Sequence, residues 1–167
     1  DYLEQKGKLY ENVRDNLFST RSLALLCKEL NIHYKLNIHY TYLGTGCIFN
    51  YKNEEEYGKE INGFTEKDEP NFFGSSYSVV KGFTDMLMHQ LGESVLNLRI
   101  RMPINTEKNQ RNFIYKITHY NKICSIPNSM TVLPDFFPII LDLMKNKTTG
   151  TLNLTNPGLI SHNEILE

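Results

Sequence analysis

The stretch SSYSVVKGFTDMLMHQLGESVLNLRI, residues 75–100, predicts a helix followed directly by a strand. Ser75 or Ser76 is a typical helix N-cap, and Gly92 is a typical helix end. Between them, the apolar residues at helical spacing are Tyr77, Val80, Phe83, Met86, Leu87 and Leu91. The apolar run 95–100 predicts a strand that Pro103 stops. A helix leading into such a strand is the repeating unit of an α/β sheet with parallel strands.

The same alternation continues on both sides of this unit. Upstream, helical spacing covers residues 9–30, and residues 38–43 predict a strand that breaks at Gly44 and Gly46. Residues 50–72 are polar and predict a long loop, in which the acidic run 54–56 is a solvated patch. Downstream we expect helices over 111–120 and 134–145, strands over 123–126 and 151–154, and a last helix capped by Ser161.

A short repeat precedes the first predicted strand. Leu30-Asn-Ile-His-Tyr34 recurs as Leu36-Asn-Ile-His-Tyr40. The offset is even, so the same residues face the same side of a strand, and either copy could enter the sheet. We expect the second copy to do so because it runs into Gly44, which makes the first copy a loop insertion. Neither histidine has a predicted chemical role.

Composition excludes several classes of protein. Of the 167 residues, 40% are hydrophobic and 22% are charged, which is typical of a soluble globular chain. The longest apolar runs fall far short of the roughly 20 residues of a membrane span, and the first residues do not resemble a secretory signal. We therefore expect a cytoplasmic protein. The net charge is −1 without a basic stripe, so nucleic acid is not an expected partner.

The three cysteines, Cys27, Cys47 and Cys124, are scattered and lack C-x-x-C spacing. This spacing argues against a disulfide framework and against a zinc site, so no metal is expected. A phosphate-binding glycine motif is also absent from the predicted strand ends. The pair Gly44 and Gly46 leads into Cys-Ile-Phe rather than into a helix.

Tyr77 and Lys81 lie four residues apart on one predicted helical face. A phenol beside an ammonium can act as an acid/base unit, and the lysine can also hold a ribose hydroxyl. The spacing alone is weak, since Tyr2 and Lys6 match it as well. Only Tyr77 follows a strand that ends in a hydroxyl-bearing loop. Thr45 in that loop can bind the carbonyl that Tyr77 protonates, because ligands bind at this edge of α/β sheets.

Three segments together resemble one enzyme family. They are Gly44-Thr-Gly-Cys-Ile-Phe49, Gly63-Phe-Thr-Glu-Lys-Asp-Glu-Pro-Asn-Phe72 and Tyr77-x-x-x-Lys81. They resemble the bifunctional 3,5-epimerase/4-reductases of nucleotide-rhamnose synthesis, which are extended short-chain dehydrogenase/reductases. The likeness continues through 98–104, 111–114, 126–133 and 156–165, and so covers nearly the whole chain.

The resemblance implies an α/β fold with a partial Rossmann-like parallel sheet and a small carboxyl-terminal substrate-binding region. Residues 1–103 would form the second half of the NAD(P)-binding domain. Residues 104–167 would be mainly substrate-binding and interleaved with that domain. The family's glycine-rich strand-turn-helix has no counterpart in this chain, so we expect these residues alone to bind NADPH poorly. The repeat before Thr45 is foreign to the family's pattern and could shift the strand that supports Thr45 and Cys47.

The resemblance also implies the chemistry. The substrate would be a nucleotide-linked 4-keto-6-deoxyglucose, in which C3 and C5 flank the C4 ketone. Cys47 and Lys116 would exchange the C3 and C5 protons, and a cysteine serves as base only as a thiolate, which a neighbouring cation favours. Thr45 and Tyr77 would polarise the C4 oxygen and stabilise the enolate. NADPH would then reduce C4, with Tyr77 supplying the proton and Lys81 holding the nicotinamide ribose.

Further roles follow from the same resemblance. Asn16 matches a helical asparagine of the family, with a structural or water-holding role. The residues that line the nicotinamide would be Met102, Pro103 and Ile104. Those that bind the nucleotide-sugar, besides Thr45, would be Gly46, Asn112, Asn128, Ser129, Met130 and Thr131. The cofactor would be NADP(H), with NAD(H) as the alternative, and a homodimer through the helices around Asn16 and Tyr77 is possible.

Several residues have a structural alternative. Cys47 could be a small buried hydrophobe, and Lys116 an ordinary exposed helix lysine. Asn128 and Thr131 could only shape a turn, while Cys124 is expected in the core. For the whole chain, the alternatives are a dTDP-4-keto-rhamnose reductase without epimerase activity and a non-catalytic regulatory subunit that keeps the fold.

Overall fold

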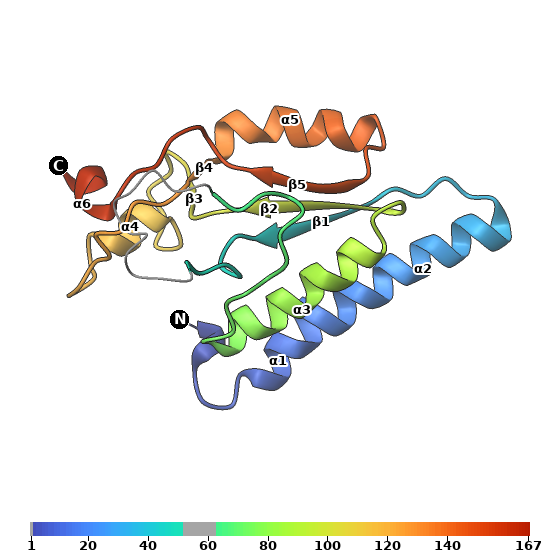
Figure 1. Cartoon of the computed structure of the whole chain (residues 1–167), viewed down its shortest axis with the longest axis horizontal. Helices are drawn as coiled ribbons and strands as arrows, with labels where there is room; N and C mark the ends of the chain where they lie inside the picture. The colour runs from blue at the N-terminus through green and yellow to red at the C-terminus, as the bar shows by residue number, and fades with distance from the viewer. Residues whose placement is uncertain (1, 52–62) are drawn as a thin grey trace.

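The structure is a computed structural model that describes residues 2–51 and 63–167. Its centre is a parallel sheet with the strand order β1-β2-β5, placed between two helical layers (Figure 1). The strands are β1 (Tyr40–Thr45), β2 (Val95–Ile100) and β5 (Gly150–Leu154). Helices α2 (Ser19–Tyr34) and α3 (Ser76–Gln90) cover one face, and α5 (Leu133–Lys145) covers the other. The predicted α/β architecture with parallel strands is confirmed.

The central strand β2 separates two apolar clusters. Val95 packs with Ala24 of α2 and Met88 of α3 on one face of the sheet. Leu96 and Leu98 pack with Leu154 of β5 and with the inner side of α5 on the other face. Alternate side chains of a strand point to opposite faces, so one short segment supports both layers.

Shorter elements complete the chain. They are η1 (Tyr2–Glu4), α1 (Leu9–Val13), a π-helical turn at Arg14–Phe18, β3 (Pro103–Ile104), α4 (Phe113–Ile117), β4 (Thr131–Val132) and α6 (His162–Leu166). Strands β3 and β4 pair in parallel as a second small sheet. Met102 has a φ of +42°, in the left-handed region, and this conformation lets the chain leave β2 and begin β3.

Two predicted elements differ in the structure. Residues 123–126 form no strand, and Cys124 is exposed rather than part of the core. Their β-branched residues suit a strand, but no sheet edge pairs with them. The first helical region also continues past residue 30 to Tyr34, so the first copy of the repeat is helix rather than a loop insertion.

The second copy of the repeat leads into β1, which begins at Tyr40 rather than at residue 38. The reason is a side-chain interaction. The Asn31 amide accepts a hydrogen bond from the Ile38 N–H and donates one to the Ile38 carbonyl, both at 2.8 Å. The backbone of Ile38 is therefore paired with a side chain instead of with a neighbouring strand.

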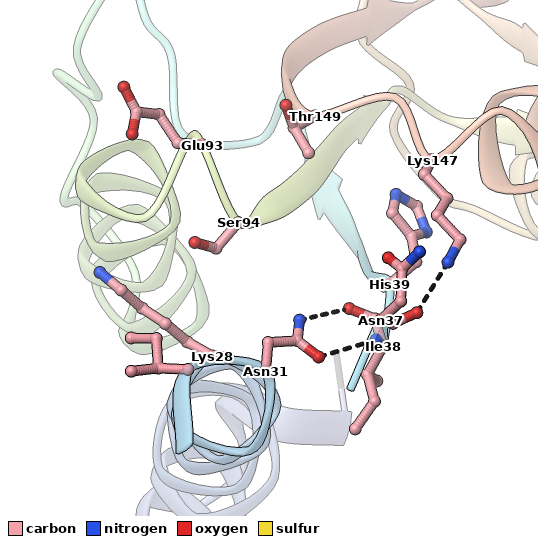
Figure 2. Close-up of a pocket in the computed structure, with 10 residues that line it drawn as sticks. Lys28, Asn31, Asn37, Ile38, His39, Glu93, Ser94, Lys147 and Thr149 are labelled. Atoms are coloured by element: carbon pink, nitrogen blue, oxygen red, sulfur yellow. Dashed lines mark hydrogen bonds between the residues drawn. The ribbon is translucent and has the colours of Figure 1, made fainter. Parts of the chain in front are cut away.

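Figure 2 shows this region around a small pocket of about 230 Å³. Lys147 Nζ donates to the Asn37 carbonyl at 2.7 Å, and His39 Nε2 lies 2.8 Å from the Thr148 carbonyl. All of these contacts lie at the amino-terminal end of β1, whereas Thr45 lies at its carboxyl-terminal end. The pairing of β1 with β2 runs without interruption from Tyr40 to Thr45. The repeat therefore does not displace the strand end that carries Thr45 and Cys47.

The buried face of α3 also differs from the predicted apolar face. Phe83 is 51% exposed, whereas Lys81, Thr84 and Asp85 are buried. Apolar periodicity misses this arrangement because β2 presents Asn97 and Arg99 to the helix, and these polar groups require polar partners.

Candidate active site

The loop after β1 and the first turn of α3 are joined directly. Ser75 caps α3 by accepting a hydrogen bond from the Ser78 N–H at 3.1 Å. The Ser78 hydroxyl donates to the Cys47 carbonyl at 2.8 Å. Tyr77, in the first turn after this cap, is thereby held at the end of the strand that carries Thr45.

Thr45 and Tyr77 meet as the sequence predicted. The buried Thr45 hydroxyl lies near enough to the Tyr77 phenol to affect its pKa, and it accepts the Cys47 N–H at 3.1 Å. Burial raises the pKa of Tyr77, and the neighbouring Cys47 raises it further, while the Thr45 hydroxyl lowers it. The phenol therefore stays protonated at neutral pH, as a proton donor requires.

Lys81 lies about one turn further along α3 than Tyr77. Its side chain is buried, and its Nζ donates to the Leu43 carbonyl at 3.2 Å and lies 4.4 Å from the centre of the Tyr42 ring. Burial lowers the pKa of Lys81 to about 8, against the opposing effects of Asp85 and Cys47. Cys47 thus interacts electrostatically with both Tyr77 and Lys81. These four predicted residues form one cluster.

Arg101, which the sequence analysis did not select, joins this cluster to the other side of the site. Its Nη1 lies 2.7 Å from Cys47 Sγ, and its Nη2 donates to Asn128 Oδ1 at 2.8 Å. Its backbone is paired with Thr131, whose hydroxyl accepts the Arg101 N–H at 2.9 Å. One signal could have identified it: an arginine directly after a buried central strand lies at the edge where α/β proteins bind ligands.

A cleft of about 410 Å³ opens beside Arg101. Three of the predicted substrate-binding residues, Gly46, Asn128 and Ser129, line it. Further lining comes from aromatic residues, among which the Phe49 and Phe64 rings are stacked with centroids 4.5 Å apart. The cleft thus combines aromatic surface with amide, hydroxyl and guanidinium groups, a combination that suits a nucleotide-sugar.

Two other predicted substrate-binding residues, Met130 and Thr131, are buried. The Thr131 hydroxyl donates to the Leu154 carbonyl at 2.6 Å and accepts the Arg101 N–H. It therefore connects β4 with β5 and with the end of β2. Met130 and Thr131 are not among the residues that line the cleft.

Helix α4 carries Asn112 and Lys116. Asn112 is the N-cap, and its amide accepts the Ile114 N–H at 3.1 Å and donates to the Asn105 carbonyl at 2.8 Å. Lys116 is exposed, and no hydrogen bond or ion pair joins it to Cys47 in the part of the chain that the structure describes. The contacts of the site therefore do not bring the two predicted acid/base residues together.

Asn16 lies in the π-helical turn between α1 and α2. Its side chain donates to Asn12 Oδ1 at 3.1 Å, and its carbonyl accepts the Thr84 hydroxyl at 2.7 Å. The turn is thereby fixed against α3 on the helical layer that carries Tyr77. Single π-helical turns are frequent at functional sites.

A second buried network lies beside the cleft. Arg99 and Asp85 form an ion pair with an Nη2–Oδ2 distance of 2.6 Å. The remaining donors of Arg99 reach the carbonyls of Thr65 and Asp68, at 3.2 and 3.1 Å. The network therefore fixes part of the segment 63–72, which the family resemblance includes, against the central strand.

Residues 2–51 and 63–167 contain no membrane-spanning helix and no cluster of metal ligands. No helix there is long and apolar enough to cross a membrane. No group of three or more His, Cys, Asp or Glu residues there could hold a metal ion.

The known proteins that are similar to this chain include enzymes of nucleotide-rhamnose synthesis. No family model matches it. A protein of Acanthamoeba polyphaga mimivirus is 62% identical over 166 residues, which are 99% of this chain and 55% of the viral protein. The crystal structure of the UDP-rhamnose synthase from that virus matches with a TM-score of 0.87 and 61% identity, over 99% of this chain and 55% of the other.

A plant protein and a bacterial structure extend the comparison. The bifunctional dTDP-4-dehydrorhamnose 3,5-epimerase/dTDP-4-dehydrorhamnose reductase of Arabidopsis thaliana is 46% identical over 158 residues, 94% of this chain and 50% of the plant protein. A dTDP-4-dehydrorhamnose reductase from Bacillus anthracis, in complex with NADP, is 18% identical with a TM-score of 0.63 over 87% of this chain and 49% of the other, and shows the same fold. The chain thus spans about half the length of these relatives.

Proposed function

We propose that this chain, a homologue of the nucleotide-rhamnose epimerase/reductases, supplies the catalytic groups for both activities on a nucleotide-linked 4-keto-6-deoxyglucose. These activities are 3,5-epimerisation and 4-keto reduction. The observation that carries the proposal is the cluster of Thr45, Cys47, Tyr77 and Lys81 at one strand end. The cleft beside it has a lining of aromatic and polar groups that suits a nucleotide-sugar. The high identity with the viral UDP-rhamnose synthase supports the UDP-sugar as substrate.

Epimerisation begins with removal of a proton from C3 or C5. The Cys47 thiolate takes this proton, the C–H electron pair forms an enolate, and the negative charge develops on the C4 oxygen. Thr45 and Tyr77 donate hydrogen bonds to that oxygen, which stabilises the charge. A proton returned to the opposite face of the same carbon inverts it, and we assign this step to Lys116. The exposed position of Lys116 then requires the substrate to lie between α4 and the loop 45–48.

Reduction takes place at C4 in the same position. A bound nicotinamide cofactor would supply hydride. Tyr77 donates its phenolic proton to the C4 oxygen, and the Lys81 ammonium, four residues further along α3, would stabilise the phenolate that remains. Tyr77 would serve both activities, because each activity places negative charge on the C4 oxygen.

The residues present fit one end of such a cofactor. Lys81 Nζ has three N–H donors, of which one reaches Leu43, so a ribose hydroxyl can accept another. Met102, Pro103 and Ile104 follow the central strand at the same edge of the sheet and would line the nicotinamide. These groups do not select between NADP(H) and NAD(H), and we propose NADP(H) from the family resemblance.

Homodimerisation is a further part of the proposal. Large apolar side chains of the first helical region are more than half exposed: Leu9, Tyr10, Phe18, Leu23 and Leu26. An apolar surface of this kind suits a second copy of the same helices. Sedimentation equilibrium tests this part, since a protein that stays monomeric at micromolar concentration contradicts it.

The decisive test uses the full-length protein that carries these residues. Cys47→Ser is expected to abolish solvent deuterium incorporation at C3 and C5 of the UDP-4-keto-6-deoxyglucose. The same variant keeps its reductase activity on substrate that is already epimerised. Unchanged deuterium incorporation would reject Cys47 as the base.

A further inference from the structure

We infer that Arg101 is the positioning residue that holds Cys47 in its thiolate form, and that the epimerase activity depends on this contact while hydride transfer does not. The inference rests on the proposed function and adds a residue to it. A guanidinium remains charged at every pH at which a protein is folded. Its Nη1 lies 2.7 Å from Cys47 Sγ, so it is the cation in direct contact with the sulfur.

The arginine is held in place from several directions. Its Nη2 donates to Asn128 Oδ1, and its backbone N–H and carbonyl are both paired with Thr131. Fixed donors stabilise charge without rearrangement at the moment of reaction. Arg101 is therefore preorganised, whereas an arginine on a mobile surface segment would not be.

Gly46 permits the close approach of the arginine stem. A Cβ at this position would lie 3.2 Å from Arg101 Cδ and 3.6 Å from Arg101 Cβ. The first distance is tighter than an ordinary van der Waals contact, so a side chain at residue 46 would displace the stem. This accounts for a glycine between the two residues that we place in the chemistry, Thr45 and Cys47.

Among the described residues, no carboxylate competes with the sulfur for the charge of Arg101. No carboxylate forms an ion pair with Arg101 within residues 2–51 and 63–167, in contrast to the buried pair at Arg99. The other titratable groups near Cys47 are Tyr77 and Lys81 of α3, and His162 of α6 lies near enough to Arg101 to feel its charge. Arg101 is thus a second cation beside Cys47 in addition to Lys81.

The consequence separates the two activities. Proton removal from C3 or C5 needs a thiolate, and Arg101 favours the thiolate. Hydride transfer to C4 needs Tyr77 and Lys81, neither of which forms a hydrogen bond with Arg101. Because Arg101 also contacts Asn128 in the cleft, its loss can weaken substrate binding in both activities. The effect on proton removal is therefore measured by comparing kcat for the two activities. KM reports the shared loss of substrate binding.

The test measures the alkylation of Cys47 by iodoacetamide as a function of pH, with peptide mass spectrometry as the readout. In Arg101→Gln, the midpoint of this pH profile is expected to move to higher pH, and the alkylation rate at pH 7 is expected to fall by about tenfold relative to its value at high pH. The exposed Cys124 of the same chain is the internal reference. Arg101→Lys keeps a positive charge and should restore most of the effect. An unchanged midpoint in Arg101→Gln overturns the inference.

The second readout is catalytic and uses the full-length protein. Arg101→Gln is expected to lower kcat for deuterium exchange at C3 and C5 by about tenfold more than it lowers kcat for reduction of the epimerised sugar. An equal loss of kcat in both activities overturns the inference. A circular dichroism spectrum identical to that of the parent protein confirms that the variant is folded. If Cys47→Ser leaves exchange intact, the proposed function fails, whereas the alkylation experiment still decides the contact between Arg101 and the thiol.

Discussion

Arg99 of β2 and Asp85 of α3 form an ion pair 2.6 Å long between side chains that are almost completely removed from solvent. The Nε of Arg99 donates to the second carboxylate oxygen at 2.9 Å, so the pair is bidentate. It lies between the central strand and the helix that carries Tyr77 and Lys81. Both the stability of the sheet and the placement of the site therefore depend on it.

Removing one partner leaves the other charge buried. Asp85→Ala is expected to lower the free energy of unfolding by about 3–5 kcal/mol, since the guanidinium of Arg99 then lacks its counter-charge. Urea denaturation measures the change. Asp142→Ala is the matched control, because Asp142 pairs with Lys145 on the surface, at an Nζ–Oδ1 distance of 3.6 Å. Loss of this largely exposed pair should change stability little. Equal effects of the two substitutions would contradict the prediction.

Burial of Lys81 predicts a pH dependence of stability. Its pKa is lowered from 10.5 to about 8, so the unfolded chain binds more protons than the folded chain between these values. The free energy of unfolding attributable to Lys81 is therefore expected to rise as the pH increases from about 8 towards 10.5, by about 1–3 kcal/mol.

Lys81→Met provides the comparison for this measurement. The rise should be present in urea denaturation of the parent protein between about pH 7.5 and about pH 9.5, one value below and one above the lowered pKa. It should be absent in the variant. Parallel pH profiles of the two proteins would show that Lys81 is not a buried cation.

Tyr77→Phe removes the proton donor without changing the ring. In the full-length protein, reduction of the 4-keto sugar is expected to fall by about 10²–10⁴-fold. Tyr2→Phe is a matched control from the same chain, because Tyr2 and Lys6 repeat the sequence spacing of Tyr77 and Lys81. A comparable loss in both variants would remove the catalytic assignment.

The contact between Asn31 and Ile38 lies far from the site. Asn31→Ala is expected to lower the free energy of unfolding by about 1–2 kcal/mol, since it leaves two backbone groups without their partner. Thermal unfolding measures this effect. Deuterium exchange at C3 and C5 should be unchanged, and a loss of exchange would show that the repeat influences the strand end at Thr45.

Local spacing predicted the parts of the site that depend on topology. Thr45 ends a strand and Tyr77 begins the following helix, so a parallel sheet brings them together whatever the loop between them does. Lys81 follows from Tyr77 by helical geometry. The loop residues 52–62 themselves lie outside the described part of the chain.

The contacts that the sequence did not reveal are of a different kind. Arg101 is 54 residues from Cys47 in the sequence, and an arginine after a strand is in most proteins a solvated surface charge. The buried face of α3 was misplaced because apolar periodicity ignores polar residues that are paired, as Asp85 is with Arg99. Residues 123–126 have the composition of a strand, but composition does not specify a pairing partner.

The register of β1 against β2 places Thr45 opposite Ile100, and the next residue, Gly46, donates its N–H to the Ile100 carbonyl at 2.9 Å. The two copies of Leu-Asn-Ile-His-Tyr lie at the opposite end of this strand, in the last turns of α2 and in the connection before Tyr40. The length of that connection is therefore structurally independent of the strand end where the thiol and the phenol lie.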